Sequence, residues 1–223
     1  MKPEKGIKPP TGSSGLQVSG LGFQVSPPWT FLAAAAVALV IQLNPAWRPA
    51  LLYDRAAVAA GEWWRVWTGH FVHFGWPHFV ADTGLLVILG WLLEARHPVF
   101  SRVGLVALPA FITAALYWFD PAMLLYGGLS AVNLGLLLFL ALQGWQRNWT
   151  DWFWPAVLVI YVGEVIFESA QGGRGGGMIR FDDPAVRVAT SAHLASAAYA
   201  LIAWLLGMSR PTKKPGPAGS APH

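Results

Sequence analysis

Six long apolar segments divide the chain, and the stretches between them are polar or rich in Gly and Pro. The segments cover residues 29–43, 79–95, 103–119, 129–145, 153–169 and 186–208. Each approaches the ~20 residues that a helix needs to cross a bilayer, although some are short. The pattern therefore predicts an all-α membrane protein with six transmembrane helices.

Polar tails flank the predicted membrane region, which covers residues 28–208. Residues 1–27 combine Lys2, Lys5 and Lys8 with Gly, Ser and Pro, and residues 209–223 are also polar. Such compositions are typical of flexible segments. The first apolar segment begins late for a signal peptide, and no small-residue cleavage site follows it. We therefore expect a spanning helix there.

The basic residues indicate the orientation, because six spans place both termini on one side. Nine of them lie on the side of the termini: Lys2, Lys5, Lys8, Arg96, Arg102, Arg147, Arg210, Lys213 and Lys214. Six lie on the other side: Arg48, Arg55, Arg65, Arg174, Arg180 and Arg187. The excess favours cytoplasmic termini.

The composition agrees with a bilayer as the surrounding solvent. The 223 residues are 55% hydrophobic and only 12% charged, whereas soluble domains carry about 25% charged residues. There are 13 Trp, a residue that gathers at membrane interfaces. The absence of Cys excludes disulfides, thiol nucleophiles and thiolate metal sites. The net charge of +4 is small, and we expect no nucleic-acid partner.

Two residues suited to hydrolysis, Ser130 and His193, stand near the starts of apolar segments. Polar residues at membrane depth are costly and indicate function, and a hydroxyl with an imidazole suffices for nucleophilic hydrolysis. Small residues occupy the helix face of His193: Ala189, Thr190, Ser196, Ala197 and Ala200. Small residues also accompany the serine: Gly127, Gly128, Ala131 and Gly135. Such faces allow two membrane helices to approach closely.

Each residue alone has a simpler interpretation. A buried histidine can bond a backbone carbonyl, and a serine is a favoured helix N-cap. Their joint occurrence favours a hydrogen bond between Ser130 Oγ and the imidazole of His193.

A second polar cluster lies between residues 64 and 82. One interpretation is a metal site built from His70, His73, His78 and Asp82. However, the chain lacks the His-Glu-x-x-His motif of an intramembrane zinc protease, so we expect no metal and no other cofactor. The other interpretation is an oxyanion hole, in which His78 and a backbone N–H at Ser130 stabilise developing negative charge.

Two connections have unusual compositions. Residues 120–128 begin with the helix-breaking pair Asp120-Pro121 and continue with apolar residues, so we expect this loop to enter the protein at membrane depth. Residues 170–185 contain five Gly within residues 171–177. This segment is either a gate beside the His193 helix or a plain linker.

Taken together, residues 62–200 resemble the rhomboid family of intramembrane serine proteases. The matching motifs are Glu62-x-Trp64-Arg65-x-x-Thr68, His73-x4-His78-x3-Asp82, Gly128-Leu129-Ser130-Ala131 and Ala192-His193. The resemblance implies a six-helix rhomboid-like bundle and a catalytic dyad of Ser130 and His193. It also implies supporting roles for His73, His78, Asp82 and Gly128, and membrane-anchored proteins as substrates.

The small size and the run Thr68-Gly69-His70-Phe71-x-His73 look most like rhombosortases. These bacterial relatives process proteins that carry a C-terminal Gly-Gly-containing sorting signal and a membrane anchor, which implies the bacterial inner membrane. A general rhomboid protease and a pseudoprotease that binds client helices are the alternatives.

The chain departs from the family pattern at several positions. Asp82 replaces the usual Asn, so it either stays protonated and donates a hydrogen bond, or orients His78. Ala131 replaces the glycine after the nucleophile, and Leu134 stands where an aromatic residue or histidine is common. These changes leave the dyad of Ser130 and His193 intact. They leave undecided which groups form the oxyanion hole.

Overall fold

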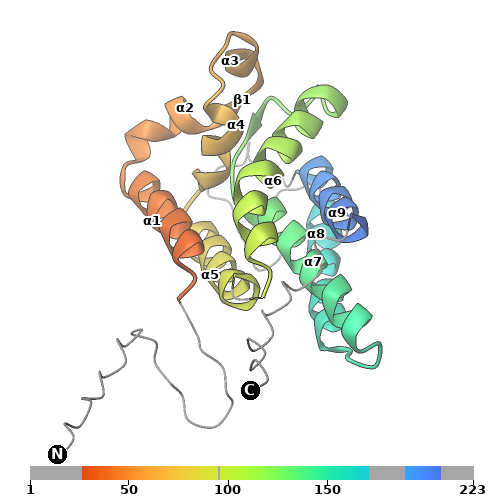
Figure 1. Cartoon of the computed structure of the whole chain (residues 1–223). Coiled ribbons are helices and arrows are strands. Elements are labelled where there is room, and N and C mark those ends of the chain that lie inside the picture. The colour runs from red at the N-terminus through yellow and green to blue at the C-terminus, as the bar shows by residue number, and fades with distance from the viewer. Residues whose placement is uncertain (1–26, 95, 171–188, 207–223) are drawn as a thin grey trace, which may run out of the picture.

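The computed structural model describes residues 27–94, 96–170 and 189–206. The predicted tails and the gate or linker at 170–185 therefore fall almost entirely outside the described residues. Long helices make up the body of the described chain (Figure 1): α1 (Trp29–Leu43), α5 (Trp76–Leu93), α6 (Pro98–Phe119), α7 (Ser130–Arg147), α8 (Phe153–Ala170) and α9 (Thr190–Leu205).

Each predicted apolar segment overlaps one of these helices within the described residues, but the predicted count of six spans is not confirmed. By length and composition, α5 and α6 are each long and apolar enough to cross a membrane. A third candidate arises if α1 and the following segment Pro45–Leu51, bent by 94°, form one broken span. Helices α1 and α9 have only 15 and 16 residues. Helix α7 carries polar residues near its ends, including Asn133, Gln143 and Arg147.

The short elements gather at one end of the helices, at the top of Figure 1. They are η1 (Pro45–Trp47), α2 (Arg48–Leu51), β1 (Tyr53–Asp54), α3 (Arg55–Ala59), α4 (Arg65–Thr68), η2 (Gly69–Phe71) and β2 (Leu125–Tyr126). Strands β1 and β2 pair antiparallel, with Tyr53 opposite Tyr126. This pairing joins the region before α5 to the segment that leads into α7.

Arg65 holds this region together from a buried position. Its Nε lies 2.6 Å from a carboxylate oxygen of Glu62. Its Nη1 donates to the carbonyl oxygens of Pro49 and Leu52 at 2.8 and 2.7 Å. A buried guanidinium needs several acceptors, and here they come from α2 with its C-cap Leu52 and from Glu62 just before α4.

The connection at 120–128 is buried only in its second half. Leu124 and Leu125 are exposed, whereas Tyr126 is buried and donates its hydroxyl to the Gly128 carbonyl at 3.2 Å. The expected entry into the protein therefore begins at Tyr126, where strand pairing satisfies the backbone.

Helix α7 is central, because it contacts α5, α6, α8 and α9. Its buried Phe139 stacks on Phe100 of α6 with ring centroids 3.5 Å apart. Helix α1 packs instead on α5, where Phe31 lies against Gly90. The described helices thus meet around α7, with α1 attached through α5.

The Gly90→Ala substitution tests the attachment of α1. A Cβ atom at Gly90 would lie 2.3 Å from Cγ of Phe31, so we expect a loss of about 1–3 kcal/mol in the free energy of unfolding. The measurement is unfolding of the full chain in mixed detergent micelles. Gly84→Ala on the same helix is the control, since a Cβ there meets nothing within 4 Å. Equal stability of the two variants would contradict the proposed contact.

Candidate active site

Ser130 and His193 meet where the first turn of α7 faces α9. His193 Nε2 lies 3.3 Å from Ser130 Oγ, and only 5% of His193 is exposed. Ser130 opens α7 and makes no side-chain N-cap, since Leu129 occupies the cap position. The hydroxyl therefore faces an imidazole, the pairing used for nucleophilic hydrolysis.

Small side chains set the distance between the two helices. A Cβ atom at Gly135 of α7 would lie 3.2 Å from the carbonyl oxygen of Ser196 and 3.3 Å from its Cβ. Ser196 is fully buried, and its hydroxyl donates a hydrogen bond to the His193 carbonyl at 2.9 Å. The helices thus approach as closely as a glycine on one side and a serine on the other allow.

Among the described residues, no carboxylate is hydrogen-bonded to the imidazole of His193. Its Nδ1 is buried and without a hydrogen bond there. The backbone N–H of His193 donates to the carbonyl of Ala189. Packing between α7 and α9 therefore orients the ring.

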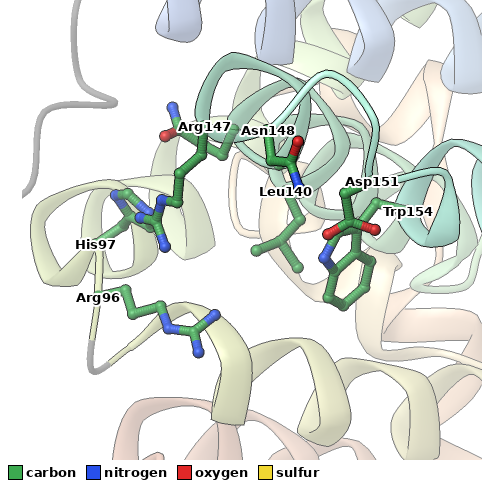
Figure 2. Close-up of a pocket in the computed structure, with 9 residues that line it drawn as sticks. Arg96, His97, Leu140, Arg147, Asn148, Asp151 and Trp154 are labelled. Atoms are coloured by element: carbon green, nitrogen blue, oxygen red, sulfur yellow. The ribbon is translucent and has the colours of Figure 1, made fainter.

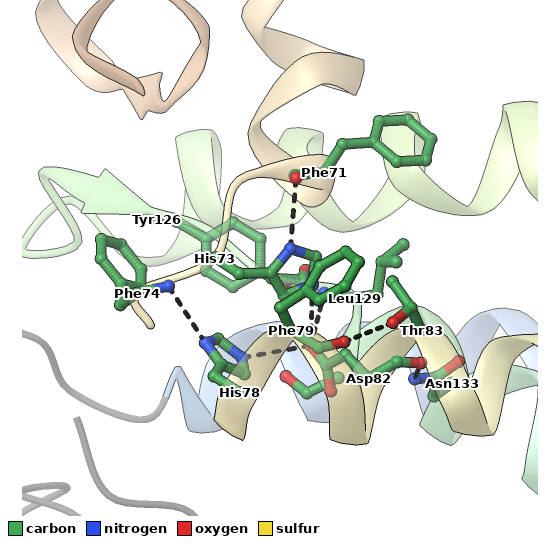
Figure 3. Close-up of polar contacts among 12 residues, drawn as sticks. Phe71, His73, Phe74, His78, Phe79, Asp82, Thr83, Tyr126, Leu129 and Asn133 are labelled. Atoms are coloured by element: carbon green, nitrogen blue, oxygen red, sulfur yellow. Dashed lines mark hydrogen bonds and ion pairs between the residues drawn. The ribbon is translucent and has the colours of Figure 1, made fainter. Parts of the chain in front are cut away.

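Asp82 of α5 is the centre of the second polar cluster (Figure 3). Its Oδ2 accepts the backbone N–H of Leu129 at 2.8 Å and lies 3.1 Å from His78 Nε2. The same oxygen lies 3.4 Å from His73 Nε2. Since Leu129 directly precedes Ser130, this carboxylate positions the start of α7.

Each neighbouring histidine has a second contact that orients its ring. His78 Nδ1 accepts the backbone N–H of Phe74 at 3.4 Å, so the hydrogen of a neutral His78 ring sits on Nε2 and points toward Asp82. His73 Nδ1 lies 3.2 Å from the carbonyl oxygen of Phe71. In this geometry the N–H of His78 is engaged by Asp82, which agrees with the alternative in which the acid orients His78.

Gly128 completes the cluster through its backbone conformation. Its φ is +113°, a region that residues with a Cβ rarely adopt. A Cβ there would lie 2.9 Å from both Cε1 and Nε2 of His78 and 3.3 Å from Asp82 Oδ2. The His78 ring therefore packs directly on the backbone two residues before Ser130.

His70 does not join this cluster. Its Nε2 lies 3.1 Å from the Pro109 carbonyl and 3.1 Å from Thr113 Oγ1, both on α6. Burial lowers the pKa of His70 to about 4, so the ring is a neutral structural donor near pH 7. Within the described parts of the chain, no group of three or more His, Asp or Glu side chains is placed to hold a metal ion.

Two residues near Ser130 received no role from the sequence. Asn133 Nδ2 donates to the backbone carbonyl of Asp82 at 2.9 Å and ties α7 to α5. The hydroxyl of Tyr161 on α8 donates to the Ser130 carbonyl at 2.7 Å. A Tyr or Asn within an apolar helix needs a hydrogen-bond partner. The sequence therefore indicates that such a partner exists for each residue, but it does not identify it.

Comparison with known proteins gives one family match. The family model described as Rhomboid domain matches residues 60–210, a range that contains all the site residues described above. Comparison with curated proteins finds no match.

The Gly128→Ala substitution tests the contact between the Gly128 backbone and His78. We expect a loss of about 1–3 kcal/mol in unfolding free energy, because backbone strain adds to overpacking. The measurement is unfolding of the full chain in mixed micelles. Gly61→Ala is the matched control, since Gly61 also has a positive φ (+103°) but open space at its Cβ. Equal losses in both variants would show that strain alone acts and that the contact with His78 contributes nothing.

Proposed function

The chain belongs to the rhomboid family of intramembrane proteases, and we propose that it is a serine protease with Ser130 as nucleophile and His193 as general base. The observation that carries this proposal is the 3.3 Å separation between Ser130 Oγ and His193 Nε2. Its substrates are membrane-anchored proteins, and no cofactor takes part.

In the proposed reaction, His193 Nε2 takes the hydroxyl proton as Ser130 Oγ attacks the scissile carbonyl carbon. The protonated ring then gives this proton to the leaving amine as the C–N bond breaks, which leaves an acyl-enzyme. A water molecule gives a proton to His193 Nε2 as its oxygen attacks the ester carbonyl carbon. The protonated ring then gives that proton to Ser130 Oγ as the bond between Oγ and the acyl carbon breaks, and the product acid leaves. An acceptor amine in place of water gives transfer instead of hydrolysis.

The base must be neutral, with its hydrogen on Nδ1, to accept a proton at Nε2. What supports this role is the buried position of His193, whose Nε2 lies beside Ser130 Oγ. Its ring needs no carboxylate for orientation, because the close packing of α7 on α9 restricts its rotation.

The developing oxyanion is assigned to the first turn of α7. N–H groups in the first turn of a helix have no acceptor within the helix, and the helix dipole favours negative charge there. The backbone N–H of Ser130 is thus one donor. His78 is the second donor in our proposal. Its ring must turn so that the Nε2–H points from Asp82 toward the substrate oxygen. Asp82 then acts by holding His78 and Leu129 in position.

The subfamily and location are part of the proposal. We favour rhombosortase-type processing of C-terminal Gly-Gly-containing sorting signals in the bacterial inner membrane, with cytoplasmic termini. Support comes from the run Thr68-Gly69-His70-Phe71-x-His73, which looks most like rhombosortases. One alternative is a general rhomboid protease, which would use the same catalytic chemistry. The other is a pseudoprotease, which would bind client helices without cleaving them.

Substitution of the dyad tests the proposed chemistry. We expect Ser130→Ala and His193→Ala each to lower cleavage of a membrane-anchored reporter by roughly 10³-fold or more. Purified full-length variants are assayed in liposomes, with fluorophosphonate labelling of the wild type as a second readout. Ser101→Ala is the control, because this buried hydroxyl donates a hydrogen bond to the nearby backbone carbonyl of His97. Continued cleavage by the Ser130→Ala protein would refute the mechanism, and a wild type that neither cleaves nor labels would favour the pseudoprotease.

Two substitutions at Asp82 separate its possible roles. Asp82→Asn keeps an oxygen that can accept the Leu129 N–H, so we expect activity within about tenfold of wild type. Asp82→Ala removes the acceptor and leaves that N–H buried without a partner, so we expect a loss above roughly 100-fold. Steady-state cleavage of the reporter measures both. Inactive Asp82→Asn protein with normal unfolding would show that the negative charge or a proton on the acid is itself required.

A further inference from the structure

A cavity of about 150 Å³ lies at the end of α7 remote from Ser130 (Figure 2). Helix α7 has 18 residues and is therefore about 25 Å long, so the cavity is separate from the candidate active site. The cavity can hold a group larger than one water, whose share of liquid volume is about 30 Å³. The lining residues come from the α5–α6 turn, the end of α7 and the start of α8: Arg96, His97, Leu140, Gln143, Gly144, Arg147, Asn148, Asp151 and Trp154.

The rim of the cavity is basic. Arg96 and Arg147 are both exposed, and neither forms an ion pair with another of the described residues. In Figure 2 both side chains lie on the same side of the cavity as His97. Asp151 lies on the opposite side beside Trp154, and its Oδ1 accepts the Phe153 N–H at 3.1 Å.

Two buried residues of the lining carry polar atoms without hydrogen-bond partners. His97 and Gln143 are 4% and 8% exposed. Neither Nδ1 of His97 nor Nε2 of Gln143 has a hydrogen bond within the described part of the chain. Such atoms are unfavourable unless a ligand or water satisfies them. The Gln143 amide nitrogen can only donate, so its missing partner is an acceptor.

The charges of the rim act on His97. Burial lowers the pKa of His97, and the guanidiniums of Arg147 and Arg96 lower it further. An anion bound between these groups would offset their charge and raise the pKa of His97 again. The titration of this ring is therefore a sensitive reporter of occupancy.

On the α8 side of the cavity, Trp154 packs closely against α7. A Cβ atom at Gly144 would lie 2.9 Å from Cδ1 of Trp154, so the indole rests directly on α7. The residues that carry the two unpartnered buried nitrogens and the two guanidiniums thus line one cavity.

From this arrangement, we propose that the cavity binds a phosphate oxyanion, carried by an anionic lipid headgroup or free in solution. The guanidiniums of Arg96 and Arg147 would make charge-assisted hydrogen bonds to it, and the Gln143 amide nitrogen would also donate to it. Binding would join the α5–α6 turn to the α7–α8 turn. The proposal does not depend on the proteolytic activity.

The experiment measures ligand retention by the purified full chain with native mass spectrometry. The three probes are inorganic phosphate, phosphatidylglycerol and phosphatidylcholine, and His97 titration is followed by NMR in the same samples. We expect one phosphatidylglycerol to be retained, no phosphatidylcholine, and a raised His97 pKa on binding. Retention of inorganic phosphate as well would support a site for any small phosphate, and retention of the lipid alone would support a headgroup site.

Matched variants decide whether the cavity itself is responsible. We expect Arg147→Gln to weaken retention roughly tenfold. Arg102→Gln removes the same charge from an exposed residue of α6 that does not line the cavity, and should bind as wild type. Gln143→Leu changes no charge and should also weaken binding, which keeps the test available if Arg147→Gln fails to fold. Equal weakening by Arg147→Gln and Arg102→Gln, or no retained anion in the wild type, would overturn the proposal.

Discussion

One carboxylate oxygen, Oδ2 of Asp82, connects the parts of the protein that the candidate site needs. It accepts the Leu129 N–H and faces the ring nitrogens of His78 and His73. A buried carboxylate is tolerated only where such donors surround it. The contact therefore positions α5, the preceding loop and the first residue of α7 together. Asn133 adds a second bond between the same helices, one turn further along α7.

The dyad depends on this anchor through packing. Once the start of α7 is fixed, the contact of Gly135 with Ser196 determines how closely α9 can lie, and that separation places His193 beside Ser130. In the Ser-His-Asp arrangement a carboxylate orients the imidazole through a hydrogen bond. Here the corresponding constraint is steric, and it is distributed along two helices.

Much of the helical architecture could be predicted, because a segment in lipid must satisfy its own backbone and so becomes a helix. Small residues around Ser130 and His193 also predicted that these two would meet. The number of spans was harder to predict from the sequence. An apolar segment can fold into a helix that is too short to cross a bilayer, and α7 carries polar residues near its ends. The orientation of His70 was inaccessible, because its partners on α6 are 39 and 43 residues away and no local pattern encodes them. The same holds for the bond from Leu129 to Asp82, whose donor is a backbone group that any residue supplies.

The short helices α1 and α9 have a consequence for the surrounding lipid. With 15 and 16 residues they extend about 22–24 Å, whereas the hydrocarbon core of a typical bilayer is about 30 Å thick. If both helices lie in the bilayer, exposed apolar side chains such as Val40 and Leu201 meet lipid over less than that thickness. Local thinning of the bilayer costs fractions of a kcal/mol per Å of mismatch. In that case the length of the lipid acyl chains would act on the stability of this protein.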